Sequence, residues 1–343
     1  MTLLAMVIAL MTAAGLTWRF CDPASRLYIL DHPNERSLHT QPTPRSGGIA
    51  VLGGIAAGGT VLGYATYPEN RELLILFISA LPVIMAAFWD DRFGLTPTVR
   101  LLAHFLAVAI LIIAGFIPPL TVLPGLTWNL PSFAAISMLL LFAVWMINLY
   151  NFMDGMDGFA GGMTVIGFLS FAIVGWQAGH PVFAGASLLI VGATLGFLVF
   201  NFPPAKIFLG DTGSSTLGFL AAAFSLWGSY DGLFPLWLAI FIFSPFVVDA
   251  TVTLARRLLH GEKIWRPHKT HYYQRLVQIG WGHRKTLLAE TFIMLACSLS
   301  ALLAMRLSSK AQGGFLMIWL LTYLSLMFGV RRLERRGAGE ASL

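Results

Sequence analysis

Charged side chains are scarce in this sequence of 343 residues, because Asp, Glu, Lys and Arg make up 11% of it, against about 25% in a soluble globular domain. Hydrophobic residues make up 57%, and the mean hydropathy is +0.75. The net charge of +6 is spread over short connections between apolar runs, which argues against a nucleic-acid-binding surface. The shortage of charge excludes an ordinary soluble domain and predicts an integral membrane protein.

Cysteine is scarce as well. Cys21 and Cys297 are far apart and show no C-x-x-C pattern, which argues against a disulfide framework or a zinc site, so we expect both to fill apolar space. Residues 1–18 are apolar without a basic segment before them, and Arg19 follows. This pattern predicts an uncleaved first membrane span rather than a signal peptide.

Long apolar runs are what the sequence has in abundance. A membrane-spanning helix needs roughly 20 largely apolar residues. Eleven runs approach this length, at residues 2–18, 47–67, 73–89, 101–118, 133–149, 159–176, 182–200, 214–230, 233–252, 287–305 and 314–330. We predict an all-α polytopic membrane protein of about eleven transmembrane helices, in a single domain over residues 1–343. The second run, GGIAVLGGIAAGGTVLG, has small residues at helical spacing, which predicts close helix packing.

The connections between these runs differ sharply in charge. If they alternate between the two sides of a membrane, one side holds all 22 Lys and Arg residues except Arg71, Arg306 and Lys310. The positive-inside rule makes that side cytoplasmic, with the N-terminus periplasmic and the C-terminus cytoplasmic. The predicted cytoplasmic loops lie near 19–46, 89–100, 148–158, 201–213 and 253–286. They or the adjoining helix ends carry the aspartates that draw attention, which are Asp90, Asp91, Asp154, Asp157 and Asp211.

Two short motifs place pairs of acids at helix ends. In FWDDRFGL, residues 88–95, the adjacent Asp90 and Asp91 repel each other, which suits a general base or a cation site, although a solvated helix end explains them too. In NLYNFMDGMDGFAGG, residues 148–162, Asp154 and Asp157 are three apart and share a helix face. A helix cap needs one polar residue there, so the second motif favours a binding site.

Three further motifs suit phosphate chemistry. In NFPPAKIFLGDTGSSTLGF, residues 201–219, glycines and hydroxyls precede a helix without the Lys of a P-loop, and Asp211 within this cradle suggests Mg²⁺ between a carboxylate and a phosphate. The basic stretch ARRLLHGEKIWRPHKTHYYQRL, residues 255–276, surrounds His268 and His271 and suits phosphate better than zinc. In DHPNERSLHTQPTPRSGGIAV, residues 31–51, the basic groups suit an anion or a solvated connector equally; they are Arg36, His39 and Arg45.

Taken in order over residues 31–276, these five motifs resemble the polyprenyl-phosphate N-acetylhexosamine-1-phosphate transferases, which are membrane enzymes of bacterial envelope synthesis in glycosyltransferase family 4. The pattern D-x-P-N-x-R-S-x-H-x-x-P-T-P-R-x-G-G, Asp31 to Gly48, is similar to the branch that starts O-antigen or related surface glycans of lipopolysaccharide. Single motifs would be weak evidence, whereas five in order are specific. About eleven spans with an outside N-terminus also fit the family.

The resemblance implies a reaction. A UDP-N-acetyl-aminosugar, similar to UDP-GlcNAc or a 6-deoxy analogue, gives its sugar-1-phosphate to undecaprenyl phosphate and releases UMP. Mg²⁺ is the implied cofactor, with Mn²⁺ as an alternative. The implied location is the bacterial inner (cytoplasmic) membrane, surrounded by membrane lipid, with the active site facing the cytoplasm. The specific sugar, the glycan pathway and the oligomeric state stay open.

The resemblance also implies residue roles. Asp211 would bind Mg²⁺ with support from Asp91, and Asp90 would act as a base toward the lipid phosphate. The implied substrate-binding residues are Arg45, Asn151, Asp154, Asp157, Asn201, Phe208, His268 and His271. Tyr272 and Tyr273 depart from the family pattern, since many relatives have histidines there.

Three alternatives remain open at this point. An aspartate could act as a covalent nucleophile instead of a base. The phospho-N-acetylmuramoyl-pentapeptide transferase of peptidoglycan synthesis is the alternative within the family, and the S-x-H-x-x-P-T-P-R pattern makes it less favoured. A transporter or lipid flippase is the alternative from another class. It predicts ionisable residues near the middle of the bilayer, whereas the acids here cluster at one face.

Overall fold

The computed structural model describes residues 1–33, 37–66, 71–263 and 268–340, with side chains as far as residue 336. Its helices are α1 (Thr2–Phe20), α2 (Gly47–Ala65), α3 (Arg71–Phe93), α4 (Pro97–Ile113), α5 (Ser132–Met153), α6 (Phe159–Gln177), α7 (Pro181–Asn201), α8 (Gly210–Tyr230), α9 (Leu236–Ile242), α10 (Ser244–Leu259), α11 (Tyr272–Leu276), α12 (Gly282–Ala304) and α13 (Ser309–Glu340). A π-helical turn, Val277–Trp281, joins α11 to α12. The strands among the described residues form two short antiparallel pairs, β1 (Leu30–Asp31) with β2 (Thr43–Pro44) and β3 (Thr121–Leu123) with β4 (Leu126–Thr127).

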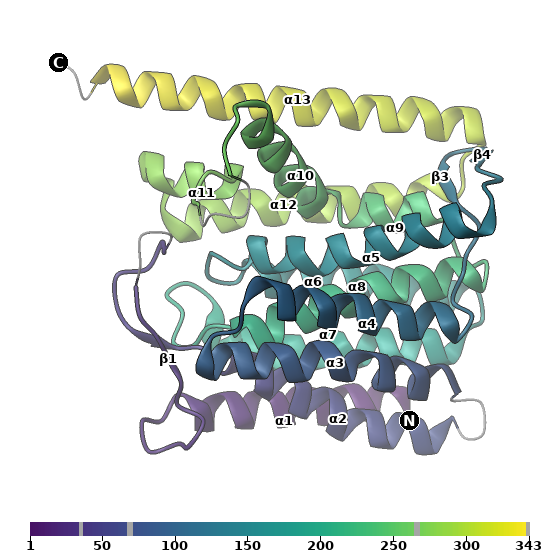
Figure 1. Ribbon diagram of the computed structural model, residues 1–343, viewed down its shortest axis with the longest axis horizontal. Coiled ribbons are helices and arrows are strands. Elements are labelled where there is room, and N and C mark those ends of the chain that lie inside the picture. Colours follow the sequence, from purple (N-terminus) through teal and green to yellow (C-terminus); the bar gives the residue numbers. More distant parts are fainter. Residues whose placement is uncertain (34–36, 67–70, 264–267, 341–343) are drawn as a thin grey trace.

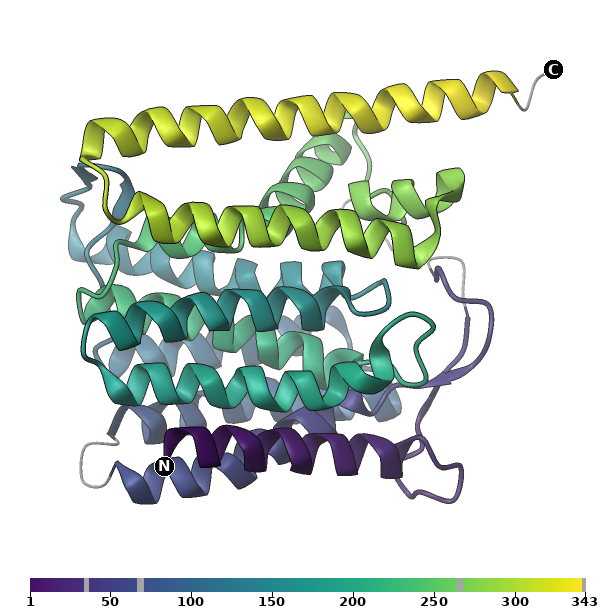
Figure 2. The ribbon, with the colours of Figure 1, turned by 180° about the vertical axis from the view of Figure 1, so that it is seen from behind.

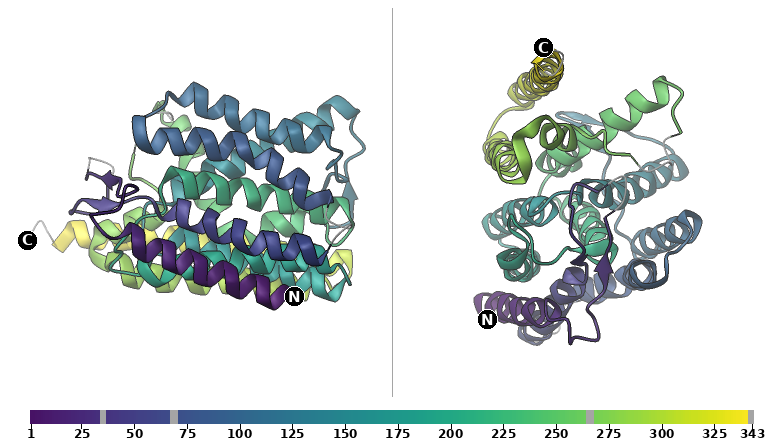
Figure 3. Two further views of the ribbon diagram at one scale, coloured as in Figure 1. Left: turned by 90° about the horizontal axis from the view of Figure 1, so that it is seen from below. Right: turned by 90° about the vertical axis from the view of Figure 1, so that its left-hand side faces the viewer.

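The long helices lie side by side in one bundle, and the loops gather at its two ends (Figure 1). The segment that contains β1 lies at one end, and the β3–β4 hairpin lies at the other (Figure 1). The N-terminus and the C-terminus also lie at opposite ends, as the view from behind and the view from below show (Figure 2 and the left panel of Figure 3). Opposite ends agree with an odd number of passes through the bundle. Which end faces the cytoplasm stays a prediction from the charges of the loops.

The prediction of an all-α polytopic membrane protein is confirmed. Each of the eleven apolar runs is helical, but fewer than eleven of the described helices meet the requirements of a regular span. Eight are long and apolar enough to cross a membrane, or nine if the bent pair α9 and α10 is one span. The other two are α4, which has only 17 residues, and α8, whose first turns are polar.

The ninth expected span, residues 233–252, is wrong as a continuous helix. It is broken at Phe243 into α9 and α10, which meet at 81°. Pro245 lies in the first turn of α10, where a missing N–H costs nothing and the fixed φ angle favours a new helix start. The bend directs α10 away from the bundle axis (Figure 1).

The centre of the bundle is α8. Every residue from Thr212 to Ser229 is buried, and α3 and α5 pack along it. Because α8 is surrounded by protein rather than lipid, it tolerates a polar sequence that a lipid-facing helix would not. It begins at Gly210 instead of the expected residue 214, because the polar GDTG segment forms the first helical turn. Gly210 itself adopts a φ of 72°, which favours glycine at the entry to the helix.

Small residues bring α1, α2 and α7 into close contact, which confirms the packing predicted for the glycine-rich run. A Cβ atom on Gly54 would lie 2.5 Å from the carbonyl oxygen of Ala9, and one on Gly58 would lie 2.4 Å from that of Ala5. At the other end of α2, a Cβ on Gly48 would lie 2.2 Å from the backbone nitrogen of Gly213 in α8. These backbones approach too closely for any side chain, so glycine sets the position of α2 against α1 and α8.

Candidate active site

Asp91, in the last turn of α3, caps the N-terminus of α8. Its carboxylate is 2% exposed and accepts hydrogen bonds from the backbone nitrogen of Asp211 at 3.0 Å and from that of Thr212 at 2.8 Å. The hydroxyl of Thr212 donates a third, at 2.6 Å. The first N–H groups of a helix have no partner within it, and the helix dipole favours a negative charge there. Asp91 therefore fixes the helix that carries Asp211.

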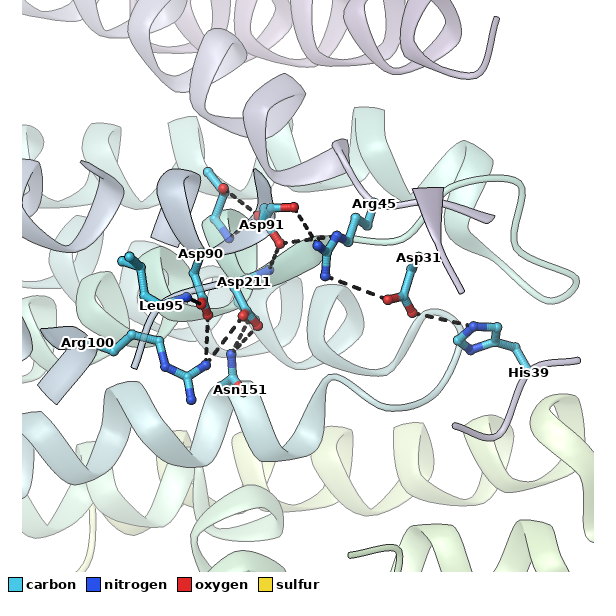
Figure 4. A network of polar contacts seen from close by, with 11 residues as sticks. Asp31, His39, Arg45, Asp90, Asp91, Leu95, Arg100, Asn151 and Asp211 are labelled. Carbon is cyan, nitrogen blue, oxygen red and sulfur yellow. Dashed lines mark hydrogen bonds and ion pairs between the residues drawn. The ribbon is translucent and has the colours of Figure 1, made fainter. Parts of the chain in front are cut away.

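Arg100, near the start of α4, joins the neighbouring acid to the same place (Figure 4). Its Nη1 lies 2.8 Å from Oδ2 of Asp90 and 3.5 Å from Oδ2 of Asp211. Asn151, near the end of α5, donates from Nδ2 to Oδ1 of Asp211 at 2.6 Å. The backbone nitrogen of Leu95 donates to the other oxygen of Asp90. Three helices thus bring two carboxylates under one guanidinium group.

Asp154 directly follows α5 and is half-buried. Within the described chain its carboxylate makes neither a hydrogen bond nor an ion pair. Burial, and then the negative charge of nearby aspartates with Asp211 first, raise the pKa of Asp154 well above the ordinary value for an aspartate. A carboxylate whose pKa is raised by burial and by neighbouring acids is a candidate functional group, and a bound cation would relieve the repulsion.

Asp157 and Asn201 brace the loops around the site. Asp157 accepts a hydrogen bond from the backbone nitrogen of Ala205 at 3.0 Å, and its Oδ1 lies 3.2 Å from Nδ1 of His283. The side chain of Asn201, at the end of α7, accepts a hydrogen bond from the backbone nitrogen of Gly158 at 2.9 Å and donates one to the carbonyl oxygen of Ile207 at 2.8 Å. Both side chains hold backbone in this structure, and their expected contacts with substrate stay predictions.

The segment before α2 pairs with the segment before α8. Phe208 donates its N–H to the carbonyl of Pro44 at 2.7 Å and accepts from the nitrogen of Gly47 at 2.9 Å. The ring of His39 lies 4.7 Å from that of Phe208, between centroids. Because these backbone segments pair, residues from the first cytoplasmic loop of the prediction lie beside Asp211.

Arg45 connects this first loop to the acids (Figure 4). Its Nη1 lies 3.6 Å from Asp31, its Nε lies 3.7 Å from Oδ1 of Asp91, and its Nη2 donates to the backbone carbonyl of Asp91. Asp31 also lies 3.4 Å from Nε2 of His39. The guanidinium group therefore lies at the edge of the acidic cluster. Arg36, the third basic residue expected there, lies outside the described residues.

The segment of residues 268–271, named the histidine loop below, packs beside the end of α5. The rings of His268 and His271 lie 4.8 Å apart, and that of His271 is stacked at 6.2 Å from Phe152. Asp249 in α10 holds the following helix, since its carboxylate accepts the N–H groups of Tyr272 and Tyr273 at 2.9 and 3.1 Å.

The structure thus brings Asp90, Asp91, Asp211, Asn151 and Arg45 into one network and places Asp154 within range of their charge. Sequence reasoning missed Arg100 and Asp31. Arg100 looked like ordinary loop charge, and only its contact with acids 10 and 111 residues away reveals its place. Among the described residues, no group of three or more His, Cys, Asp or Glu side chains is arranged to hold a metal ion by itself.

Several known proteins are similar to this sequence. A family model described as glycosyl transferase family 4 matches residues 73–229, which include α5, nearly all of α3 and α8, and the carboxylates of Asp90, Asp91 and Asp211. A probable undecaprenyl-phosphate N-acetylglucosaminyl 1-phosphate transferase of Bacillus subtilis (strain 168) is 34% identical over 302 residues, which cover 87% of this chain and 83% of the relative. The chain belongs to glycosyl transferase family 4.

Two other members show the breadth of the family. An undecaprenyl-phosphate alpha-N-acetylglucosaminyl 1-phosphate transferase of Yersinia pestis is 25% identical over 91% of this chain and 87% of its own length. A phospho-N-acetylmuramoyl-pentapeptide-transferase of Shouchella clausii (strain KSM-K16) is 31% identical over 70% of this chain and 76% of its own length. As a family 4 member, the protein is a membrane-bound transferase.

Proposed function

We propose that this family 4 transferase moves the sugar-1-phosphate of a UDP-N-acetyl-aminosugar onto undecaprenyl phosphate and releases UMP. The observation that carries the proposal is the convergence of acids from α3, the end of α5 and α8 at one end of the bundle, with Arg100 between two of them. The Bacillus subtilis and Yersinia pestis relatives, which are named as undecaprenyl-phosphate N-acetylglucosaminyl 1-phosphate transferases, support a polyprenyl phosphate acceptor and an N-acetylglucosamine donor. The excess of Lys and Arg in the loops supports a cytoplasmic site in the bacterial inner membrane.

The side chains suit Mg²⁺. This ion is commonly held by one or two carboxylates, with substrate phosphates and water as its other ligands. Asp211 and Asp154 would hold it, because Asp154 has no partner in the described chain and lies in the field of Asp211. Asp91, the second ligand implied by the resemblance, already accepts three hydrogen bonds from α8. When bound, the ion would offset the negative charge of the donor diphosphate and the acceptor phosphate.

The bond changes are those of a phosphoryl transfer. An oxygen of the lipid phosphate attacks the β-phosphorus of the donor and forms a new P–O bond. The bond between that phosphorus and the oxygen shared with the α-phosphate breaks, and its electron pair leaves with UMP. Such reactions depend mainly on positioning and charge. Arg100 would stabilise the charge that develops, and Asp90, which Arg100 and Leu95 contact, would accept a proton from the lipid phosphate.

The other basic groups surround this centre. His268, His271 and Arg45 are proposed to bind phosphate oxygens of the donor, since Arg45 borders the acids and the histidine loop borders the end of α5. Phe208 would contact the uracil base of the donor. The product would be the first lipid-linked intermediate of an O-antigen or a related surface glycan, as the Asp31 to Gly48 pattern suggests.

The direct test is product analysis with purified protein, undecaprenyl phosphate, Mg²⁺ and a panel of donors. The panel holds UDP-GlcNAc, UDP-GalNAc, a UDP-6-deoxy-aminosugar and UDP-N-acetylmuramoyl-pentapeptide. We expect UMP from an aminosugar donor, and no UMP when EDTA removes Mg²⁺. Release of UDP would indicate ordinary glycosyl transfer, turnover of the pentapeptide donor alone would indicate the peptidoglycan enzyme, and no product from any donor would contradict the proposal and favour transport.

Two variants tie the test to the site. Asp211→Asn should abolish Mg²⁺-dependent UMP release while the protein remains folded and inserted. Asp231→Asn is the matched control, because Asp231 follows the opposite end of α8 and pairs with His180 at 3.1 Å. It should keep wild-type turnover. Normal activity in Asp211→Asn would remove the cation assignment.

A further inference from the structure

Tyr273 links three parts of the chain. It is the second residue of α11 and is fully buried. Its hydroxyl donates to the carbonyl oxygen of Phe152 in α5 at 3.0 Å, while its backbone nitrogen donates to Asp249 in α10 at 3.1 Å. Its ring lies 4.8 Å from that of Phe159 in α6 and is stacked at 6.1 Å from that of His271.

The carbonyl that Tyr273 binds lies between two residues of the candidate site. Phe152 is in the last turn of α5, where carbonyl groups lack a partner within the helix. One residue before it, Asn151 donates to Asp211, and two residues after it, Asp154 carries the carboxylate without a partner in the described chain. The Tyr273 hydroxyl therefore fixes the backbone from which both side chains project.

Gly155 leaves the space that the Tyr273 hydroxyl occupies. A Cβ atom added at Gly155 would lie 2.3 Å from the Tyr273 hydroxyl oxygen and 3.4 Å from the ring carbon that carries it. The first distance is far inside van der Waals contact, whereas the second is tight but tolerable. The backbone after Asp154 therefore runs directly against the hydroxyl group, and any side chain at residue 155 would push the two segments apart.

We propose that Tyr273 is a positioning residue for the donor side of the active site. Its hydroxyl holds the α5–α6 connection, with Asn151 and Asp154, against the histidine loop. The donor must contact both segments at once under the proposed function, on which this inference rests for the identity of the donor. Under the proposed function the histidine loop contacts the donor and not the acceptor lipid, so the Tyr273 contact should act on donor binding rather than on acceptor binding.

The adjacent tyrosine provides a matched control. The hydroxyl of Tyr272 is buried and makes no hydrogen bond to α5 or to the candidate site. Tyr272→Phe and Tyr273→Phe remove the same atom from neighbouring residues, but only the second removes a hydrogen bond to the site. Tyr273→Phe should raise KM for the UDP-sugar by roughly tenfold and leave KM for undecaprenyl phosphate unchanged. Tyr272→Phe should keep both constants.

A double-mutant cycle tests the contact itself. Gly155→Ala should weaken donor binding because the added methyl group meets the Tyr273 hydroxyl. In Tyr273→Phe the hydroxyl is gone, so the pair Gly155→Ala/Tyr273→Phe should bind donor at least as well as Gly155→Ala alone. Residues in contact show such coupling, and independent residues do not.

The proposal is overturned if Tyr273→Phe has the donor KM of Tyr272→Phe, if donor and acceptor KM rise together, or if the two changes at 155 and 273 are additive. Failure of the proposed function gives a different result, because wild-type protein would then release no UMP from any donor. In that case the same cycle, measured by thermal unfolding, still decides whether the hydroxyl and residue 155 are coupled.

Discussion

Asp91 caps α8 through Thr212, whose backbone nitrogen and hydroxyl oxygen lie 2.8 and 2.6 Å from one carboxylate oxygen. Because the carboxylate of Asp91 is used by these hydrogen bonds, its main role is to hold α8 in place rather than to take part in the reaction. The adjacent Asp90 has a different environment, because Arg100 binds it and also contacts Asp211. Two neighbouring acids in the sequence therefore have separable tasks, and substitutions should distinguish them.

The capping role predicts graded losses of stability. Asp91→Asn keeps one acceptor, and Asp91→Ala keeps none. We expect the free energy of unfolding to fall by roughly 0.5–2 kcal/mol, with the larger loss for the alanine variant. Thermal unfolding followed by tryptophan fluorescence measures this, with Asp211→Asn as the comparison that should change the midpoint far less. An Asp91→Ala protein with the wild-type midpoint and no turnover would make Asp91 a ligand instead of a cap.

Arg100 should contribute to turnover through charge. In Arg100→Gln the carboxylates of Asp90 and Asp211 lose their shared cation, and kcat should fall by about 10²-fold, as when one electrostatic donor is removed from an active site. Arg100→Lys should lose less. Arg92→Gln is the control, since Arg92 is exposed and lies over the Phe88 ring, 5.5 Å from its centroid. Equal kcat values for the two glutamine variants would remove Arg100 from the reaction.

The raised pKa of Asp154 predicts how stability depends on pH. An aspartate whose pKa is higher in the folded protein binds its proton more tightly when folded, so its ionisation destabilises the fold. Without metal, stability should therefore fall as the pH rises from about 4, the ordinary aspartate value, through the raised pKa. Asp154→Asn should flatten this part of the curve.

Mg²⁺ offers the complementary measurement for Asp154. If the ion binds near this carboxylate, adding it at neutral pH should raise the unfolding midpoint of wild-type protein more than that of Asp154→Asn. Asp22→Asn, at a residue that pairs with Arg19 on the exposed end of α1, controls for nonspecific effects of the salt. Equal responses of all three proteins to pH and Mg²⁺ would contradict the assignment of Asp154.

Glycine at residue 48 should be essential for the junction of α2 with α8. A Cβ there would lie 2.2 Å from the backbone nitrogen of Gly213, so Gly48→Ala must move one backbone or the other. We expect a lower unfolding midpoint and weakened activity, because Asp211 lies two residues before Gly213 in α8. Gly15→Ala in α1 is the control, as its Cβ would have nothing within 4 Å. It should be neutral or stabilising, since alanine is the better helix former.

The sequence was sufficient to locate the acids at one end of the bundle. Each apolar run is long enough to cross the bundle once, so successive loops lie at alternate ends. Counting the runs therefore predicted the end at which each charged loop and each motif lies. The break at Phe243 was not predicted, because the apolar character of residues 233–252 hides the start signal that Pro245 provides. The sequence of α8 is long enough for a membrane span, and this was predicted. Its position at the centre of the bundle was not, because that position depends on the helices that surround it.

Within the site, the sequence predicted which aspartates lie together better than it predicted what each one contacts. Asp91 and Thr212 are 121 residues apart, and Arg100 and Asp211 are 111 apart, so their contacts depend on how α3, α4 and α8 pack. No local pattern distinguishes a capping carboxylate from a free one. For the same reason, Tyr273 was visible only as a departure from the histidine pattern, and its contact with Phe152 appears only in the fold.

The most direct measurement follows the β-phosphorus of the donor. Purified protein is given UDP-GlcNAc, or whichever donor the panel selects, labelled with ³²P at the β-phosphate, together with undecaprenyl phosphate and Mg²⁺. Sugar-1-phosphate transfer predicts that the label moves into the lipid fraction while unlabelled UMP stays in the water phase. Label that remains in soluble UDP while sugar enters the lipid would contradict the account.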